Sequence, residues 1–163
     1  MKTFKKVLFL DMDGVIHNDA SYMKYGQMID IGGVKILSKL ILEQDLGIVF
    51  SSTWRIGVDR DVVSDYLKLC GFPPSVLHQD YKTRDLIGEH RGSLIQEWLD
   101  AHPEVEQYVI VDDDDDMLPS QKENFIHVDG MNGFGVRDFY RAESIFKGYR
   151  TGQCKEHINM GRK

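Results

Sequence analysis

The stretch KVLFLDMDGV, residues 6–15, decides the fold of this chain. Its first half, residues 6–10, is an apolar run typical of a buried strand, and the run stops at Asp11, with Asp13 two positions later. If strand alternation continues, both carboxylates point to one side while Met12 turns into the packing. Gly14 then permits a tight exit in which the backbone and a ligand approach closely. The stretch therefore predicts a buried strand that ends at a functional edge.

Outward from this stretch, short apolar runs alternate with amphipathic segments. Further strands are predicted at 48–51, 76–78, 108–111 and 125–128. Helices are predicted around 34–41 with Gly47 as the stop, from Asp59 or Asp61 to Gly71, and around 94–99 with an end near Pro103. Alternating strands and helices of these lengths imply right-handed crossovers. We therefore predict an α/β fold with a three-layer, Rossmann-like parallel sheet.

The composition is that of an ordinary globular chain. With 163 residues, 42% apolar and 28% charged, the chain is predicted to form one domain over residues 1–163. Its longest apolar runs are about four residues, far below the roughly 18 that span a bilayer, so no membrane partner is expected. Asp11 interrupts the basic and apolar start before a secretion signal could form, and Cys70 and Cys154 are expected to be free thiols. A cytoplasmic location is the resulting expectation.

The formal charge of −6 is unevenly distributed. Asp11, Asp13 and the run 112–116 contribute seven acids, and without them the charge would be +1. The acids are therefore concentrated where they could hold a cation, and a cation can bring a phosphate with it. The basic residues of the predicted frayed tail, 147–163, could contact a nucleic-acid backbone, although a solvated terminus is the simpler expectation.

Polar clusters follow three of the predicted strands. Asp11 and Asp13 follow the first, Ser51-Ser52-Thr53-Trp54-Arg55 follow the second, and Asp112 and Asp113 follow the fourth. In open parallel sheets ligands bind beyond the carboxyl ends of the strands. Paired carboxylates repel one another unless a proton or a cation lies between them, and Mg²⁺ accepts one or two carboxylates together with waters and phosphate oxygens. A magnesium site is therefore predicted at this edge.

Such a site suggests phosphoryl transfer. A carboxylate beside the metal ion can attack phosphorus, and a second aspartate can supply and remove protons. Donors at Ser51 and Ser52 and one fixed cation would hold the phosphoryl oxygens. Arg91 is the first choice for that cation, with Lys82 and Arg84 as alternatives.

These residues resemble the haloacid dehalogenase (HAD) superfamily of phosphatases. The resemblance rests on DMDGV at 11–15, the apolar strand ending in Ser51, the basic residue opening RGSLIQEWL at 91–99, and the acidic pair after YVIV at 108–111. The family more often has lysine than arginine at its third motif. By the resemblance, the fold is of HAD type and the activity is Mg²⁺-dependent hydrolysis of a phosphomonoester through an aspartyl-phosphate.

The resemblance also implies a role for each matching residue. Asp11 is the nucleophile, and Asp13 is the general acid/base and a metal ligand through its main-chain carbonyl. By the same resemblance, Ser51 is the phosphoryl-binding hydroxyl and Arg91 the phosphoryl-binding cation. Asp112 and Asp113 are the metal-site acids, with Asp116 as a reserve. Together with Asp11 and Asp13, Asp112 and Asp113 make four residues assigned to the metal. Beyond the resemblance, the residues expected to contact substrate are Gly14, Ser52, Thr53, Arg55, Lys82 and Arg84.

More narrowly, KTRDLIGEHRGSLIQEWL and YVIVDDDDDM resemble the small HAD domains of Swiss-army-knife RNA-repair proteins. Only 39 residues separate Asp11 from Ser51, enough for one helix and a flap at about 15–32, so no large cap is expected. An open site suits a nucleic-acid terminal phosphate or a nucleotide. A small metabolite or a protein as substrate, and a non-catalytic module that binds phosphate ends, are the alternatives.

Overall fold

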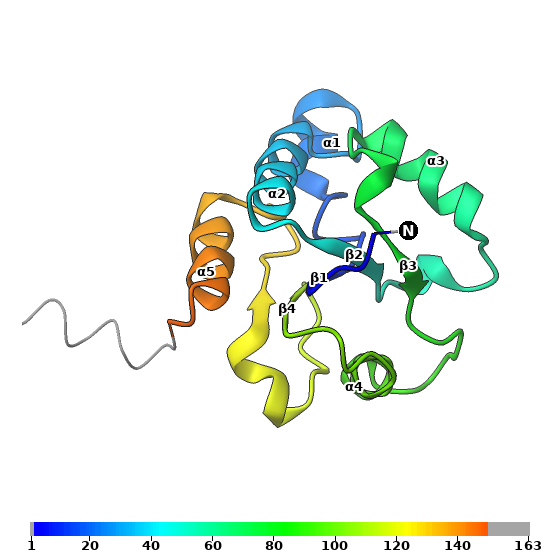
Figure 1. The fold of residues 1–163 in the computed structure, drawn as a ribbon. Coiled ribbons are helices and arrows are strands. Elements are labelled where there is room, and N and C mark those ends of the chain that lie inside the picture. Colours follow the sequence, from blue (N-terminus) through cyan, green and yellow to red (C-terminus); the bar gives the residue numbers. More distant parts are fainter. Residues whose placement is uncertain (1, 150–163) are drawn as a thin grey trace, which may run out of the picture.

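The computed structural model describes residues 2–149, and strands and helices alternate in it as the sequence predicts (Figure 1). The strands are β1 (Lys6–Leu10), β2 (Gly47–Phe50), β3 (Leu77–Lys82), β4 (Gln107–Asp112) and β5 (Phe125–His127). The α-helices are α1 (Asp19–Tyr25), α2 (Ile31–Gln44), α3 (Arg60–Cys70), α4 (Arg91–Ala101) and α5 (Val136–Phe146). Three 3-10 turns are η1 (Thr53–Arg55), η2 (Pro74–Val76) and η3 (Pro119–Asn124). Residues 150–163 of the predicted frayed tail, Cys154 included, lie outside the described residues.

The five strands form one parallel sheet in the order β3-β2-β1-β4-β5. Leu8 at the centre of β1 pairs with Ile48 of β2 on one side and with Val109 of β4 on the other. This order places the carboxyl ends of β2, β1 and β4 next to one another. The predicted parallel α/β sheet is therefore confirmed, and it brings together the three strands that the polar clusters follow.

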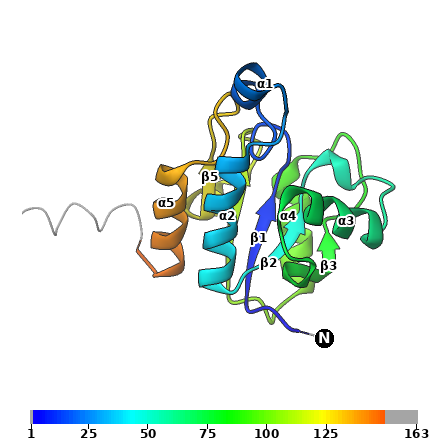
Figure 2. The same cartoon turned by 90° about the horizontal axis from the view of Figure 1, so that it is seen from above.

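Helices cover both faces of the sheet, which gives the predicted three layers. The larger apolar cluster joins Leu8 and Leu10 of β1 to side chains of α2, α3 and α5, whereas Phe9 faces Ile95 and Trp98 of α4 in the smaller one. Figure 1 shows α2 and α4 on opposite sides of the strands, and Figure 2 shows α2 and α5 side by side. Side chains that alternate along β1 are thus buried on both faces, which explains the continuous apolar run in the sequence.

The predicted helix stop at Gly47 is wrong. Helix α2 ends at Gln44, and Asp45 caps it in the left-handed conformation at φ 56°, with its N–H bonded to the carbonyl of Ile41. Gly47 is instead the first residue of β2, where a Cβ atom would lie 2.7 Å from the ring of Phe4. The glycine is needed for close packing beneath the sheet and not for ending the helix. The cap predicted for α3 is confirmed, because Asp59 accepts a hydrogen bond from the N–H of Val62 and the helix ends before Gly71.

The segment between β1 and β2 holds only α1, α2 and their connections, so no large cap is inserted there. The flap predicted at 15–32 contains α1, which Asn18 caps by accepting a hydrogen bond from the N–H of Ser21. A bridge between His17 and Ile29 closes the base of this segment. Among residues 2–149, the longest apolar helices fall short of what is needed to cross a bilayer.

Candidate active site

Carboxylates from β1 and β4 meet at the carboxyl end of the sheet. Asp11, directly after β1, and Asp112, the last residue of β4, are buried, and Asp113 is half-buried beside them. Each of the three offers a carboxylate oxygen, and these oxygens all lie within 4.8 Å of one another. We call these three residues the acid cluster. Its members are three of the four residues that the sequence analysis assigned to the metal.

The acid cluster is electrostatically costly without a cation. Burial, and next the charge of Asp112, raise the pKa of Asp11 to about 7. Burial likewise raises the pKa of Asp112 to about 6, and burial together with Asp114 raises the pKa of Asp113. Buried carboxylates so close together stay charged only where positive charge compensates them. A divalent cation that prefers oxygen ligands would supply that charge, so the acid cluster fits Mg²⁺.

Two glycines make room for the carboxylate of Asp113. Gly14 has a φ of 76°, which favours glycine, and a Cβ atom built on it would overlap the Asp113 carboxylate. Gly130, in the loop after β5, would place a Cβ atom 2.6 Å from Oδ2 of the same residue. The backbone of two separate loops therefore holds the carboxylate of Asp113 next to those of Asp11 and Asp112. Gly14 was predicted to allow close approach of a ligand, and the group that approaches it here is this carboxylate.

Among the described residues, Arg91 is the base that pairs with the acid cluster. It is the first residue of α4, and its guanidinium pairs with the carboxylate of Asp112 and lies 3.3 Å from Oδ1 of Asp11. Burial alone would lower the pKa of Arg91, but the carboxylates of Asp112 and Asp11 raise it. Its backbone N–H donates to Oδ2 of Asp116 at 2.9 Å, so the acid considered as a reserve metal ligand instead anchors the start of α4.

The two alternative cations are engaged elsewhere. The ammonium of Lys82 donates to the carbonyls of Arg55 and Val58 and to the carboxylate of Asp85. Arg84 is exposed and pairs with Glu97 on α4. Of the three candidates, Arg91 is therefore the one placed against Asp11.

The residues that follow β2 differ in their contacts. The Ser51 hydroxyl is fully buried and has no hydrogen-bond partner among the described residues, while a hydrogen bond from Ser52 lowers the pKa of Asp11 and opposes the effect of burial. Thr53 is exposed in η1. Ser51 is thus a buried donor that a bound phosphoryl oxygen could satisfy.

Arg55 was predicted to bind substrate, but its guanidinium is built into the scaffold. The side chain is 3% exposed, and each of its three nitrogens donates to backbone carbonyls, those of Ser51 and Ser52 and of the segment 83–86. It therefore ties the end of β2 to the segment after β3. The sequence shows a basic residue near Ser51. It does not show that the carbonyls of the segment 83–86, about 30 positions further along the chain, accept hydrogen bonds from it.

Asp13 lies outside the acid cluster, in a second group of side chains. Because β1 ends at Leu10 and the chain turns after Met12, strand alternation does not extend to Asp13, whose side chain is 66% exposed. One carboxylate oxygen accepts from Nε1 of Trp54 at 2.9 Å, and the other lies 3.3 Å from Nδ1 of His17. His17 in turn bonds to the hydroxyl of Tyr66 on α3. Asp13 is therefore held in place at both oxygens, at the rim of the site.

His17 and Tyr66 were not predicted as site residues. His17 is buried, and both of its ring nitrogens contact partners. Its spacing of four from Asp13 was a weak signal, whereas Tyr66 lies 49 positions further along the chain. Trp54 packs against both rings, with centroids 5.1 Å from His17 and 5.4 Å from Tyr66.

Comparison with known families finds one match that covers most of the chain. A family model described as HAD domain in Swiss Army Knife RNA repair proteins matches residues 7–139. The matched region begins in β1, ends in α5 and includes every residue of the acid cluster. Among curated proteins and among solved structures, nothing matches this chain.

Proposed function

Since this chain belongs to the family of HAD domains in Swiss Army Knife RNA repair proteins, we propose that it is a Mg²⁺-dependent phosphatase that removes terminal phosphates from nucleic acid. The observation that carries this proposal is the acid cluster: a buried carboxylate, Asp11, at the end of β1, with two further acids within 4.8 Å and the guanidinium of Arg91 beside them. A nucleophile, a metal site and a cation for phosphoryl oxygens are thus close together.

In the first step a carboxylate oxygen of Asp11 attacks phosphorus, and the bond from phosphorus to the leaving oxygen breaks. Asp13 protonates the leaving oxygen. Arg91 and the hydroxyls of Ser51 and Ser52 hold the phosphoryl oxygens. The product of this step is an aspartyl-phosphate on Asp11 and a free hydroxyl on the nucleic acid.

In the second step a water molecule attacks the aspartyl-phosphate. Asp13 takes a proton from the water, the bond between Asp11 and phosphorus breaks, and inorganic phosphate leaves. A Mg²⁺ ion held by Asp11, Asp112 and Asp113 would offset the repulsion between the negatively charged nucleophile and the negatively charged phosphate. The contacts of Asp13 with Trp54 and His17 favour this role, because they fix the carboxylate while leaving it open to solvent.

The lack of a large cap favours a nucleic-acid end over a small metabolite. Among the described residues, the segment between β1 and β2 holds only α1, α2 and their connections, so no inserted domain would exclude a phosphate attached to a long chain. The description of the family, which places such domains in RNA repair proteins, supports the same substrate class.

Turnover of an aryl phosphate with Mg²⁺ tests the reaction, and 3′- and 5′-phosphorylated oligonucleotides, mononucleotides and sugar phosphates test the substrate. Asp11→Asn should abolish turnover while the far-UV circular dichroism is unchanged. Asp65→Asn, which removes the same charge from an exposed ion pair on α3, should retain it. Turnover by Asp11→Asn at the parent rate would refute Asp11 as nucleophile.

The two-step mechanism has its own test. Asp13→Asn should slow hydrolysis of the intermediate, and rapid-quench labelling should then detect a phospho-enzyme that hydroxylamine releases. If labelled protein forms equally in Asp11→Asn, the phosphoryl group is carried by another residue.

A further inference from the structure

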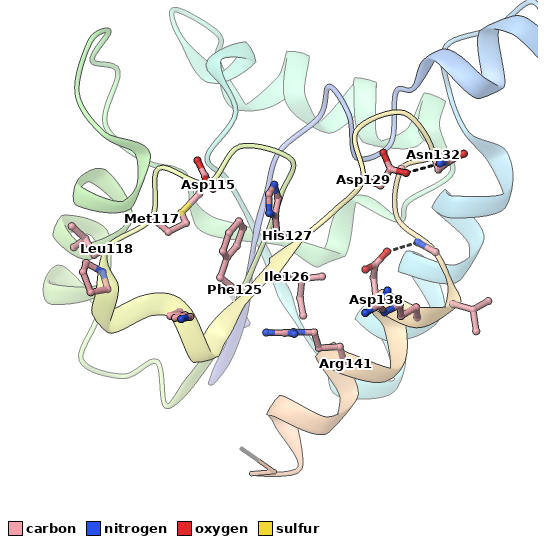
Figure 3. Close-up of a pocket in the computed structure, with 16 residues that line it drawn as sticks. Asp115, Met117, Leu118, Phe125, Ile126, His127, Asp129, Asn132, Asp138 and Arg141 are labelled. Carbon is pink, nitrogen blue, oxygen red and sulfur yellow. Dashed lines mark hydrogen bonds between the residues drawn. The ribbon is translucent and has the colours of Figure 1, made fainter. Parts of the chain in front are cut away.

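A groove lies at the free edge of β5, between η3 and the first turns of α5 (Figure 3). Its volume is about 780 Å³, and we call it the β5 groove. Figure 3 shows Phe125 and His127 next to each other on β5 and Arg141 reaching towards the strand from α5. Its lining includes two rings, Phe125 and His127, and three cations, Lys122, Arg137 and Arg141.

The β5 groove presents three exposed cations among its lining residues. Lys122, Arg137 and Arg141 are exposed, and none of the three forms an ion pair with another described residue. Two acids of the lining are already engaged. Asp129 accepts from the N–H of Met131 and from the side chain of Asn132, and Asp138 accepts from the N–H of Gly135. Asp115 is the third acid of the lining. Three cations without an ion-pair partner among the described residues therefore face a groove in which local donors already engage the carboxylates of Asp129 and Asp138.

The β5 groove also presents aromatic surface. The rings of Phe125 and His127 lie 5.5 Å apart with an angle of 21° between their planes. Phe125 is half-buried and His127 is exposed, so the stack is open on the histidine side. Grooves that bind single-stranded nucleic acid combine cations along the backbone with rings on which bases stack. The β5 groove contains both kinds of group.

The β5 groove is continuous with the acid cluster. His127 donates from Nε2 to the carbonyl oxygen of Asp113 at 2.8 Å. Gly130, which follows β5, packs against the carboxylate of Asp113. Asp115, in the loop that follows the acid cluster, also lines the groove. A chain whose terminal phosphate lay at the acid cluster could therefore run directly into the groove.

We propose that the β5 groove binds the single-stranded RNA adjoining the terminal phosphate, with Lys122, Arg137 and Arg141 on its phosphates and the Phe125–His127 stack under a base. This inference rests on the proposed function for the location of the terminal phosphate. A peptide added along the edge of β5 is the competing occupant, but the unpaired cations favour a polyanion. A site that senses the length of the RNA would thus lie at the β5 edge of the sheet, which is opposite to the β3 edge.

Fluorescence anisotropy of a labelled ten-nucleotide RNA with a terminal phosphate, in Mg²⁺, tests the proposal. The variant Lys122→Gln, Arg137→Gln, Arg141→Gln is compared with Lys5→Gln, Lys35→Gln, Lys68→Gln, which loses the same charge on exposed residues away from the groove. Three phosphate contacts predict a slope of about −2 for log K against log salt, so the parent should lose about 16-fold in affinity between 50 and 200 mM salt. The groove variant should bind at least about tenfold more weakly with a much smaller slope, whereas the control should match the parent.

A second measurement separates this proposal from the proposed function. The ratio of kcat/KM for the RNA to kcat/KM for an aryl phosphate should fall at least about tenfold in the groove variant and stay constant in the control. If that ratio and the RNA affinity match the parent, the groove proposal is overturned while the phosphatase stands. If the parent hydrolyses no phosphate ester, the proposed function fails, and the anisotropy result still decides whether the groove binds RNA. Binding of a ten-residue peptide in place of RNA would also overturn the proposal.

Discussion

Gly130→Ala should weaken Mg²⁺ binding without disturbing the fold. The added Cβ atom would lie 2.6 Å from Oδ2 of Asp113, whereas ordinary contacts begin at 3.4 Å. The oxygen must therefore move by about 0.8 Å, which is several times the roughly 0.2 Å that a metal site tolerates. It cannot move freely, because Gly14 packs against the same carboxylate. Since φ at Gly130 is not positive, alanine itself adds no backbone strain.

The expected size follows from the loss of one well-placed ligand. Displacing groups that orient metal ligands typically costs 10–100-fold in affinity, so the Kd for Mg²⁺ should rise at least about tenfold. At a Mg²⁺ concentration about 100 times the parent Kd, binding stabilises the parent by about 2.7 kcal/mol and the variant by about 1.4 kcal/mol. For a chain of this size the difference is about 3–5 °C in Tm.

Thermal unfolding across a Mg²⁺ titration measures this difference, with a Mg²⁺-free melt to show that the fold is intact. Gly135→Ala is the matched control, since its Cβ atom would meet its nearest neighbour, Asp138, at an ordinary 3.8 Å. An equal Mg²⁺-dependent rise in Tm for the parent and for Gly130→Ala would show that the carboxylate of Asp113 does not hold the ion.

Three more predictions concern charge, scaffold and rim. Burial raises the pKa of Asp11 to about 7 and of Asp112 to about 6, so the metal-free protein should lose stability as pH rises from about 4 to about 7. Because protons compete with Mg²⁺ for these carboxylates, the Tm increase on adding Mg²⁺ should be larger at pH 8 than at pH 5. Equal increases at both pH values would contradict this. Arg55→Ala leaves several buried carbonyls without a donor and should cost about 3 kcal/mol, a fall of about 10 °C in Tm; a change below about 2 °C would rule out the scaffold role. Trp54→Phe removes the N–H that donates to Asp13 and should lower kcat about tenfold without changing the Mg²⁺ affinity. Aryl phosphate turnover measures kcat, and a Mg²⁺ titration measures the affinity. An unchanged kcat would show that this hydrogen bond does not position the acid/base.

The order and type of the elements could be predicted because local sequence determines them. The apolar run before Asp11 is continuous since β1 is buried on both faces, and Asp59 and Gly71 mark the ends of α3 with side-chain and backbone chemistry that acts within a few residues. The meeting of Asp11 with Asp112 also follows from the sequence, because parallel strands place their carboxyl ends at one edge. Gly47 was misassigned because its neighbour, Phe4, is distant in sequence.

The role of Arg55 could not be predicted, because it depends on distant partners. Arg91 was the first choice for the cation, whereas Arg55 was expected to contact substrate, and both are basic residues near a predicted strand end or helix start. The carbonyls of 83–86 engage Arg55, whereas the carboxylates of Asp112 and Asp11 engage Arg91. The same limit applies to Tyr66, which reaches His17 only after α3 is packed.

For the proposed RNA partner, the net charge of the chain is a poor guide. A total of −6 argues against a polyanion, but it includes the acid cluster and two acids of the β5 groove, Asp129 and Asp138, whose carboxylates are engaged within the protein. A divalent ion would offset the first group, and backbone and side-chain donors satisfy the second, as they do for Asp129 and Asp138. What an approaching strand meets is the set of cations that no acid engages, Lys122, Arg137 and Arg141. Since screening limits each exposed charge to a reach of about 8–10 Å, this local arrangement and not the total decides whether RNA binds.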